Sequence, residues 1–329
     1  MSLQISLMQQ IKQHKKETWE VRFSLDGKRL ISSDGEALYL CQLNEQGLWE
    51  YERSLPFHRA ALPCFAPDGK LFAFSNQKKN IQLVSLEGKD IATLPNLSQA
   101  DFTFSPDQRW LVSGDMSRNI LFWDLHTYEY FRIPVPFLAR KRSSKEDAHM
   151  PIETINYFRF SPDGQRLVFG ASSEEGYIQI CHVDPFQKRL TLQKTLPISG
   201  MIGQVISLNG KFLAIVQQDD VSIYDLESFQ LLRIFPSTTE ARYDLLAFSP
   251  DSNFLMSSKS DGLVDIWSLS TFEHVLSFAA HPELITYWTE PIGGLDWSRT
   301  GYIATGGAGS FDDDMLNTDY TIKIWKVEY

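Results

Sequence analysis

Residues 158–169 read FRFSPDGQRLVF, in which two short apolar runs flank a polar Ser-Pro-Asp-Gly turn. Pro presets φ at the second position of such a turn, and Asp suits the third. Gly then takes the left-handed position that lets the chain return. The stretch therefore predicts a tight hairpin between two strands that are half-buried or buried.

The same hairpin pattern occurs seven times along the 329 residues. The turns read FSLDG (23–27), FAPDG (65–69), FSPDQ (104–108), FSPDG (160–164), ISLNG (206–210), FSPDS (248–252) and WSRTG (297–301). Their first residues are 39 to 56 positions apart. Self-similarity at this period is typical of propellers and other repeat architectures.

A third strand follows each hairpin at a nearly fixed distance, 18 to 28 residues after the turn motif opens. Its anchor residues are Cys41, Val84, Trp123, Cys181, Tyr224, Trp267 and Trp325. A fourth run follows in most units, for example at 231–235. Four short strands in each of seven units predict an all-β fold, a seven-bladed β-propeller with four-stranded antiparallel blades.

The seventh unit lacks a fourth strand, because the chain stops at Tyr329, four residues after its third-strand anchor. Residues 3–12 alternate apolar and polar side chains and precede His14, which lies nine residues before Phe23. We expect this N-terminal segment to complete the last blade and close the ring, so that residues 1–329 form a single domain. Closure would remove two exposed sheet edges.

In its third strands the chain resembles the WD-repeat β-propeller family, and the resemblance covers the whole sequence. Trp123-Asp124 is the dipeptide that names the family, and SDGLVDIW (260–267) and TDYTIKIW (318–325) look like its third-strand entry. The repeats are degenerate, because the usual Gly-His dipeptide is absent, and the many SPDG turns resemble bacterial members. The resemblance implies a non-catalytic scaffold that binds macromolecules.

The family's blades often contain a buried hydrogen-bond tetrad of His, Ser or Thr, Asp and Trp. The residues that match it in blade seven are His281, Thr305, Asp319 and Trp325. The resemblance implies a structural role for them, that of tying the strands of the blade together. Blade one has His14 and Ser32 but Cys41 in place of Trp, and blade six lacks the His.

Composition restricts the partners and the compartment. The net charge is −10 with a pI of about 5.2, whereas nucleic-acid binders usually carry a basic domain. Three cysteines, an odd number, lie in apolar strand-like runs, as buried free thiols do. The N-terminus has its basic residues after the apolar stretch, the wrong order for a signal peptide. We expect a cytoplasmic protein without a membrane span.

No catalytic motif stands out: HExxH, G-x-S-x-G, P-loop and CxxC sequences are all absent. We therefore expect no enzyme activity, no cofactor and no metal. Asp312, Asp313 and Asp314 lie in an acidic loop whose oxygen ligands would suit Ca²⁺. However, the regular D-x-D-x-D-G order is missing, so a solvated acidic loop is the simpler interpretation.

The long insertions indicate where a partner binds. SPDG turns join first to second strands and lie at one face, whereas the insertions 137–153, 279–291 and 307–319 all lie at the opposite face. Loops on a rigid scaffold often carry function. We predict a protein or peptide partner there, bound by the basic cluster Arg140, Lys141, Arg142 and Lys145, the aromatic pair Tyr287 and Trp288, and the acidic residues Asp312, Asp313 and Asp314.

The alternative is a propeller hydrolase or lyase with its site at the central channel. Its candidate residues on the inner strands are Glu20, Arg22, Asp101, Arg159 and Asp296. The opposing interpretation of these charges is a solvated, mutually paired lining. An enzyme should show converging groups with perturbed pKa values, and a platform should show a broad, shallow surface.

Overall fold

A computed structural model of the chain describes most of its residues, in ranges that end at the edges of several loops. The described residues are 3–56, 61–76, 78, 80–95, 101–115, 117, 119–135, 155–171, 176–198, 203–217, 219–237, 241–282, 291–308 and 320–329. They form strands joined by turns. No helix in these ranges is long and apolar enough to cross a membrane.

The strands form seven four-stranded antiparallel sheets, numbered here as blades in chain order. Blade 1 contains β2 (Glu20–Phe23), β3 (Arg29–Ser33), β4 (Leu38–Leu43) and β5 (Trp49–Leu55). Blade 2 contains β6 (Ala61–Phe65), β7 (Leu71–Ser75), β8 (Ile81–Ser85) and β9 (Asp90–Leu94). Blade 3 contains β10 (Phe102–Phe104), β11 (Trp110–Gly114), β12 (Asn119–Asp124) and β13 (Tyr130–Pro134).

The later blades follow the same order of strands. Blade 4 contains β14 (Ile155–Phe160), β15 (Arg166–Ala171), β16 (Tyr177–Asp184) and β17 (Arg189–Pro197). Blade 5 contains β18 (Gly203–Ile206), β19 (Phe212–Gln217), β20 (Asp220–Asp225) and β21 (Leu231–Phe235). Blade 6 contains β22 (Tyr243–Phe248), β23 (Phe254–Lys259), β24 (Leu263–Ser268) and β25 (His274–Ala279). Blade 7 contains β26 (Ile292–Trp297), β27 (Tyr302–Gly307) and β28 (Ile322–Glu328).

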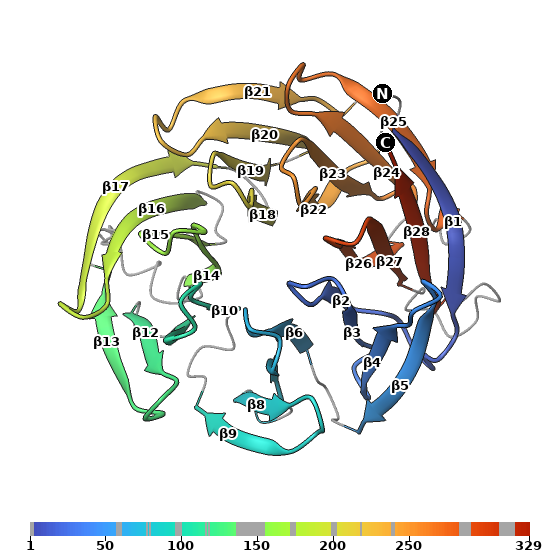
Figure 1. Cartoon of the computed structure of the whole chain (residues 1–329). Coiled ribbons are helices and arrows are strands. Elements are labelled where there is room, and N and C mark those ends of the chain that lie inside the picture. The colour runs from blue at the N-terminus through green and yellow to red at the C-terminus, as the bar shows by residue number, and fades with distance from the viewer. Residues whose placement is uncertain are drawn as a thin grey trace, which may run out of the picture. The chain divides into compact units, whose positions relative to one another are not determined.

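The N-terminal strand β1 (Gln4–Ile11) is the fourth strand of blade 7. It pairs antiparallel with β28, from Gln4 opposite Glu328 to Ile11 opposite Ile322, and Figure 1 shows the two strands side by side near both termini. The predicted seven-bladed propeller, with its last blade completed by the N-terminal strand, is confirmed.

Contacts between Cα atoms group the chain into two compact units, Met1–Thr93 with Gly203–Tyr329, and Leu94–Ile202. In the first unit the first strands of successive blades contact one another in the order β18, β22, β26, β2 and β6. In the second unit, β10 contacts β14. The first strand of each blade therefore packs against the first strand of the next blade within its unit.

The second and third strands hold the core. All five residues of β11 are buried, whereas the outer strand β13 is largely exposed. A strand that is covered on both faces needs apolar side chains at successive positions. The second strands of the blades therefore do not alternate apolar and polar residues. Two of the cysteines belong to this core: burial raises the pKa of Cys41 and of Cys181 to about 12. Cys64 is only half-buried, which corrects the expectation that all three would be buried.

The repeated turns have the predicted backbone geometry. Gly27, Gly69, Gly164, Gly210 and Gly301 all have positive φ at the last turn position. Blades 3 and 6 place Gln108 and Ser252 there, with φ of 62° and 58°. A non-glycine residue is strained in this left-handed region, because its Cβ approaches the following carbonyl oxygen.

We expect Gln108→Gly to raise the free energy of unfolding by about 0.5–1 kcal/mol, because glycine relieves this strain at an exposed position. Gly69→Ala should lower it by about 1 kcal/mol, because φ is +66° there. A Cβ at Gly69 meets no atom within 4 Å, so backbone conformation alone is tested. Urea unfolding measures both. A Gly69→Ala protein as stable as the unmodified one would contradict the strain argument.

Candidate functional site

The residues predicted to bind a partner lie outside the described residues. This holds for the basic cluster (Arg140, Lys141, Arg142, Lys145), the aromatic pair (Tyr287, Trp288) and the acidic residues Asp312, Asp313 and Asp314. The strands that flank each insertion are described, and they fix which end of its blade the loop leaves. We call this the loop end, opposite the SPDG-type turns. The binding role of these residues stays a prediction.

One described segment, 15–19, lies at the loop end of blades 1 and 7. Its backbone bonds to both blades: the Thr18 N–H donates to the Gly307 carbonyl at 2.9 Å, and the Trp19 N–H donates to the Ser33 carbonyl at 2.8 Å. The Thr18 hydroxyl donates to the carbonyl of Tyr320 at 3.3 Å. The segment is therefore fixed between β3 and β27, next to the end of the acidic insertion.

Two glycines of blade 7 make room for Thr18, which is fully buried. A Cβ on Gly293 would lie 2.0 Å from the Thr18 carbonyl oxygen, and one on Gly306 would lie 2.5 Å from Thr18 Cγ2. Neither contact is sterically possible, so these positions require glycine. The close approach makes Thr18 a rigid anchor for the residue that follows it.

That residue, Trp19, presents a large aromatic ring to solvent, with 43% of its surface exposed. The ring packs on the turn between β3 and β4, where a Cβ on Gly35 would lie 2.8 Å from Trp19 Cη2. Gly35 also has a φ of +77°, so two constraints favour glycine beneath the ring. A tryptophan held by a fixed backbone and open to solvent is the kind of residue that dominates protein interfaces.

The charges around Trp19 are unevenly paired. Lys16 forms an ion pair with Glu36 at 2.7 Å, and both side chains are exposed. Glu17 is half-buried, and no ion pair joins it to a cation of the described residues. Loss of hydration raises the pKa of Glu17 above its ordinary value, while a side-chain hydrogen bond from Trp19 acts in the opposite direction.

His14 holds the start of this segment. It is buried, its Nε2 lies 3.0 Å from Ser32 Oγ, and its ring lies 4.2 Å from that of Tyr39. This is the His–Ser pair expected in blade 1. Burial lowers the pKa of His14 to about 4, and the nearby Asp34 carboxylate only partly opposes the shift.

We expect the shift at His14 to make the protein acid-labile. In the unfolded chain the pKa is near 6.5, so the unfolded state binds the proton first as pH falls. The stability that depends on neutral His14 is present above pH 6.5 and is lost towards pH 4, by about 3 kcal/mol in total. Urea unfolding across this range should show the stability gap between the unmodified protein and His14→Gln narrowing as pH falls. A constant gap would contradict the assignment.

The inner-strand residues of the enzyme alternative are engaged in pairs or backbone contacts. In the first unit, Arg22 lies 2.8 Å from Glu20, and Asp296 accepts the Phe23 and Trp297 N–H groups at 2.7 and 2.9 Å. Desolvation raises the pKa of Asp296, while Arg22 and these N–H groups oppose the shift. In the second unit, Arg159 lies 2.9 Å from Asp101. Such pairing matches the lining interpretation of these residues.

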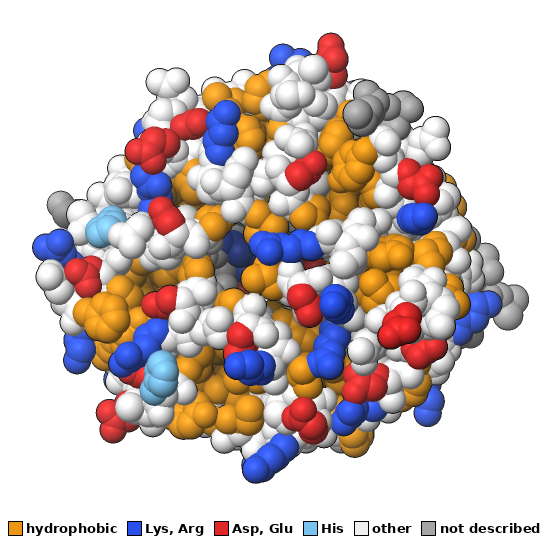
Figure 2. All heavy atoms as spheres, in the orientation of Figure 1, with side chains coloured by type: hydrophobic (Ala, Val, Ile, Leu, Met, Phe, Trp, Pro, Cys, Tyr) orange, Lys and Arg blue, Asp and Glu red, His pale blue; other side chains and the backbone are white. Residues whose placement is uncertain are grey.

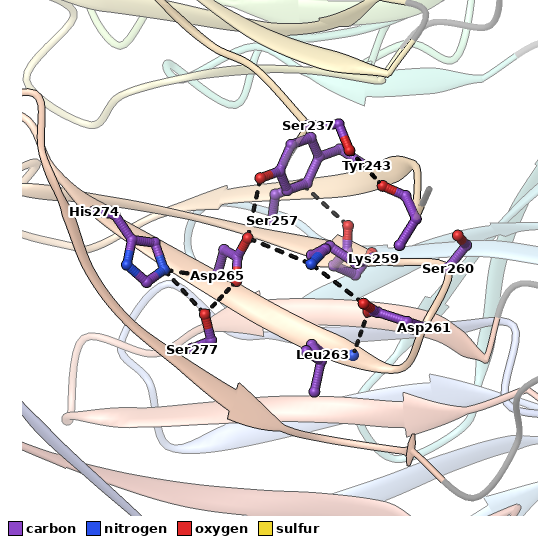
Figure 3. A network of polar contacts seen from close by, with 12 residues as sticks. Ser237, Tyr243, Ser257, Lys259, Ser260, Asp261, Leu263, Asp265, His274 and Ser277 are labelled. Atoms are coloured by element: carbon purple, nitrogen blue, oxygen red, sulfur yellow. Dashed lines mark hydrogen bonds and ion pairs between the residues drawn. The ribbon is translucent and has the colours of Figure 1, made fainter. Parts of the chain in front are cut away.

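Blade 6 contains a Ser, a His and an Asp in contact, shown in Figure 3. The Ser277 hydroxyl donates to Asp265 Oδ1 at 2.6 Å, and His274 Nε2 lies 3.0 Å from Ser277 Oγ and 3.7 Å from Asp265 Oδ1. In a catalytic triad the two imidazole nitrogens separately serve the Ser and the Asp. Here a single nitrogen faces both and the hydroxyl donates to the carboxylate, so the serine is not activated.

The rest of the blade 6 network is structural. Tyr243 donates its hydroxyl to Asp265 Oδ2 at 3.0 Å. Lys259, which is 4% exposed, lies 3.2 Å from Asp261 and 3.9 Å from Asp265. These partners satisfy the hydrogen-bonding capacity of the buried Asp265 carboxylate. With His274 and Ser277 included, the network joins all four strands of a blade that lacks the tetrad histidine.

Three of the four predicted tetrad residues meet in blade 7. Trp325 Nε1 donates to Thr305 Oγ1 at 3.0 Å, and His281 Nε2 lies 3.1 Å from the same oxygen. His281 and Thr305 are fully buried. Asp319 lies outside the described residues, so the complete tetrad stays a prediction.

Metal ligands do not gather in the described part of the chain: no group of three or more His, Cys, Asp and Glu side chains there could hold an ion. Asp312, Asp313 and Asp314 of the acidic insertion, whose oxygen ligands would suit Ca²⁺, lie outside those ranges. Figure 2 shows acidic and basic side chains interspersed with hydrophobic ones on the face in view.

Comparison with known proteins agrees with the fold. The β-propeller domain of Cps50 (Swd1) from Myceliophteria thermophila superposes with a TM-score of 0.75 over 99% of this chain and 100% of that one, at 16% identity. The protein is a seven-bladed β-propeller.

Sequence comparison then identifies the repeats. Residues 91–124 and 231–268 match the family described as WD domain, G-beta repeat. The putative guanine nucleotide-exchange factor SED4 of Saccharomyces cerevisiae is 27% identical over 139 residues, 41% of this chain and 13% of SED4. The WD repeat-containing protein WDS homolog of Arabidopsis thaliana is 24% identical over 284 residues, 82% of this chain and 50% of that protein. Two segments of the chain therefore match WD repeats, and the chain spans half or less of these two relatives.

Proposed function

We propose that this protein is a non-catalytic scaffold that binds a partner protein or peptide at the loop ends of its blades. The observation that carries the proposal is the exposed Trp19 ring, which is held by backbone bonds to β3 and β27. A rigid anchor of this kind loses little conformational entropy on binding. A WD-repeat propeller also fits a protein-interaction scaffold.

The enzyme alternative has less support. Its five candidate residues make ion pairs or backbone hydrogen bonds within their own units. The Ser277–His274–Asp265 contact lacks the geometry of a triad. Nothing among the described residues favours a second function.

Affinity capture from host cells with the full chain tests the scaffold. Trp19→Ala should reduce capture of specific partners about tenfold or more, as loss of a hot spot does. Reversing Arg140, Lys141, Arg142 and Lys145 to Glu should weaken capture and flatten its salt dependence, because rim charges steer association. The charge reversal should barely change the melting temperature, since surface substitutions usually stay within about 0.5 kcal/mol each.

The control variants are Lys28→Glu and Lys70→Glu, beside SPDG-type turns at the opposite ends of their blades. Both should capture partners normally. If these two abolish capture while the loop-end variants bind as the unmodified protein does, the partner uses the turn end and the proposal fails.

A further inference from the structure

The aromatic ring of Trp19 offers a surface suited to a cation. One side of the ring covers Gly35, and 43% of the residue is open to solvent. A lysine ammonium or arginine guanidinium within about 6 Å of such a ring is attracted by its negative face, and tryptophan is the strongest partner of this kind. An aliphatic side chain would use only the apolar character of the ring.

The carboxylate of Glu17 supplies the second half of a cation site. Glu17 lies two residues before Trp19 on the same fixed segment, and the two side chains interact. It is half-buried, and no cation of the described residues forms an ion pair with it. A partly desolvated carboxylate gains more from an incoming cation than an exposed one does, because less water screens the pair.

The neighbouring charges leave a deficit of cations. Lys16 already forms an ion pair with Glu36. Asp34 accepts the Tyr39 hydroxyl at 2.8 Å and the N–H groups of Lys15, Glu36 and Ala37, and these hydrogen bonds hold its pKa below the ordinary value, so it is ionised. Lys15 is the one exposed cation of segment 15–19 that forms no ion pair with a described residue. The whole chain carries a net charge of −10, which attracts a basic partner.

We infer that Trp19 and Glu17 form a recognition site for a lysine or arginine side chain of a partner protein, with the cation over the indole ring and against the carboxylate. This inference rests on the proposed function and names the chemistry of its partner. An acidic segment would place like charge against Glu17, and a purely apolar one would bury that carboxylate unpaired. Both arrangements cost free energy.

A defined probe tests the inference directly. It is a fluorescein-labelled ten-residue peptide of alternating Lys and Gly, compared with the same peptide acetylated at every lysine. Fluorescence anisotropy with the full-length protein at 50 mM NaCl should give at least about tenfold tighter binding of the charged peptide. Glu17→Gln should weaken binding about fivefold, and Trp19→Leu, which keeps apolar volume without an aromatic face, about fivefold as well.

Two further variants sharpen the test. Lys16→Ala releases the Glu36 carboxylate and removes a competing cation, so it should tighten binding of the charged peptide about twofold to fivefold. Glu45→Gln and Leu48→Ala are the matched control substitutions: they remove one carboxylate and one apolar side chain at the turn between β4 and β5, the opposite end of blade 1. They should leave binding unchanged, and melting temperatures should show that each variant is folded.

The outcomes separate this inference from the scaffold proposal. Equal binding of the charged and acetylated peptides, or equal losses from Glu17→Gln and Glu45→Gln, would overturn recognition of a cation by this site. If Trp19→Ala abolishes capture of host partners while Glu17→Gln captures them normally, the scaffold stands and the basic partner is wrong. If capture survives every loop-end variant, the scaffold proposal itself fails.

Discussion

A protein that lacks residues 1–13 is expected to melt at least about 10 °C below the full chain and to aggregate on heating. The deletion removes β1, whose pairing with β28 runs from Gln4 to Ile11. Leu3 and Ile11 are buried in the full chain, and burial of each such side chain contributes about 1.5–3 kcal/mol. Without β1, β28 becomes an open edge that can pair with another molecule.

The N-terminal strand also joins blade 7 to blade 1. The Gln9 side chain forms two hydrogen bonds with the backbone of Trp49: its Nε2 donates to the carbonyl at 2.6 Å, and its Oε1 accepts the N–H at 2.9 Å. Gln9→Ala should therefore destabilise the protein by about 1–3 kcal/mol, because two backbone groups lose their partners. Adding a synthetic peptide of residues 1–13 should restore part of the melting temperature of the truncated protein. If truncation lowers that temperature by only a few degrees, β1 does not stabilise the last blade.

Sequence reasoning predicted the blades because their determinants are local. Turn chemistry and apolar runs act over about ten residues, so the seven hairpins could be recognised one by one. Four strands were predicted for every blade, but the positions of the outer strands of blades 1 and 2, β5 and β9, were not. An outer strand is exposed along most of its length, as the sequence WEYERSL of β5 illustrates, and so carries no apolar pattern.

The candidate site was harder to predict, because it depends on the residue at which strand β2 begins. Alternate side chains of a β-strand point to the same face, and Val21 and Phe23 are buried. A strand that included Trp19 would therefore bury its ring on that face. The strand begins only at Glu20, and Trp19 instead covers the turn at Gly35. Its partners in blade 1, Ser33 and Gly35, lie 14 and 16 positions away in the sequence, a pairing that no local pattern reveals. The same holds for Asp265, whose partners Tyr243 and Ser277 lie on other strands.

Trp325→Ala is expected to lower the free energy of unfolding by about 3–5 kcal/mol, because it leaves a large cavity in the core of blade 7. His281→Ala should cost less, about 1–3 kcal/mol, because the Thr305 hydroxyl loses one of its two partners and keeps the hydrogen bond from Trp325. Thr305→Val keeps the side-chain volume but leaves Trp325 Nε1 and His281 Nε2 without their shared partner. Its cost should be about 2–4 kcal/mol. Urea unfolding of the single and double variants measures the coupling, expected at about 0.5–3 kcal/mol for residues in one network.

Blade 3 offers a matched control in which the same positions lack the hydrogen bond. Ser113 and Trp123 occupy the register of Thr305 and Trp325, with Trp123 opposite Leu111 as Trp325 is opposite Ile303. Ser113 Oγ and Trp123 Nε1 are buried and have no hydrogen-bond partner among the described residues. Ser113→Ala should therefore be neutral or stabilising, because it removes a buried polar group that is not satisfied. Trp123→Phe should likewise lower the free energy of unfolding by less than Trp325→Phe does, because only Trp325→Phe breaks a hydrogen bond. Equal costs in the two blades would show that packing alone, and not the hydrogen bonds of Thr305, stabilises blade 7.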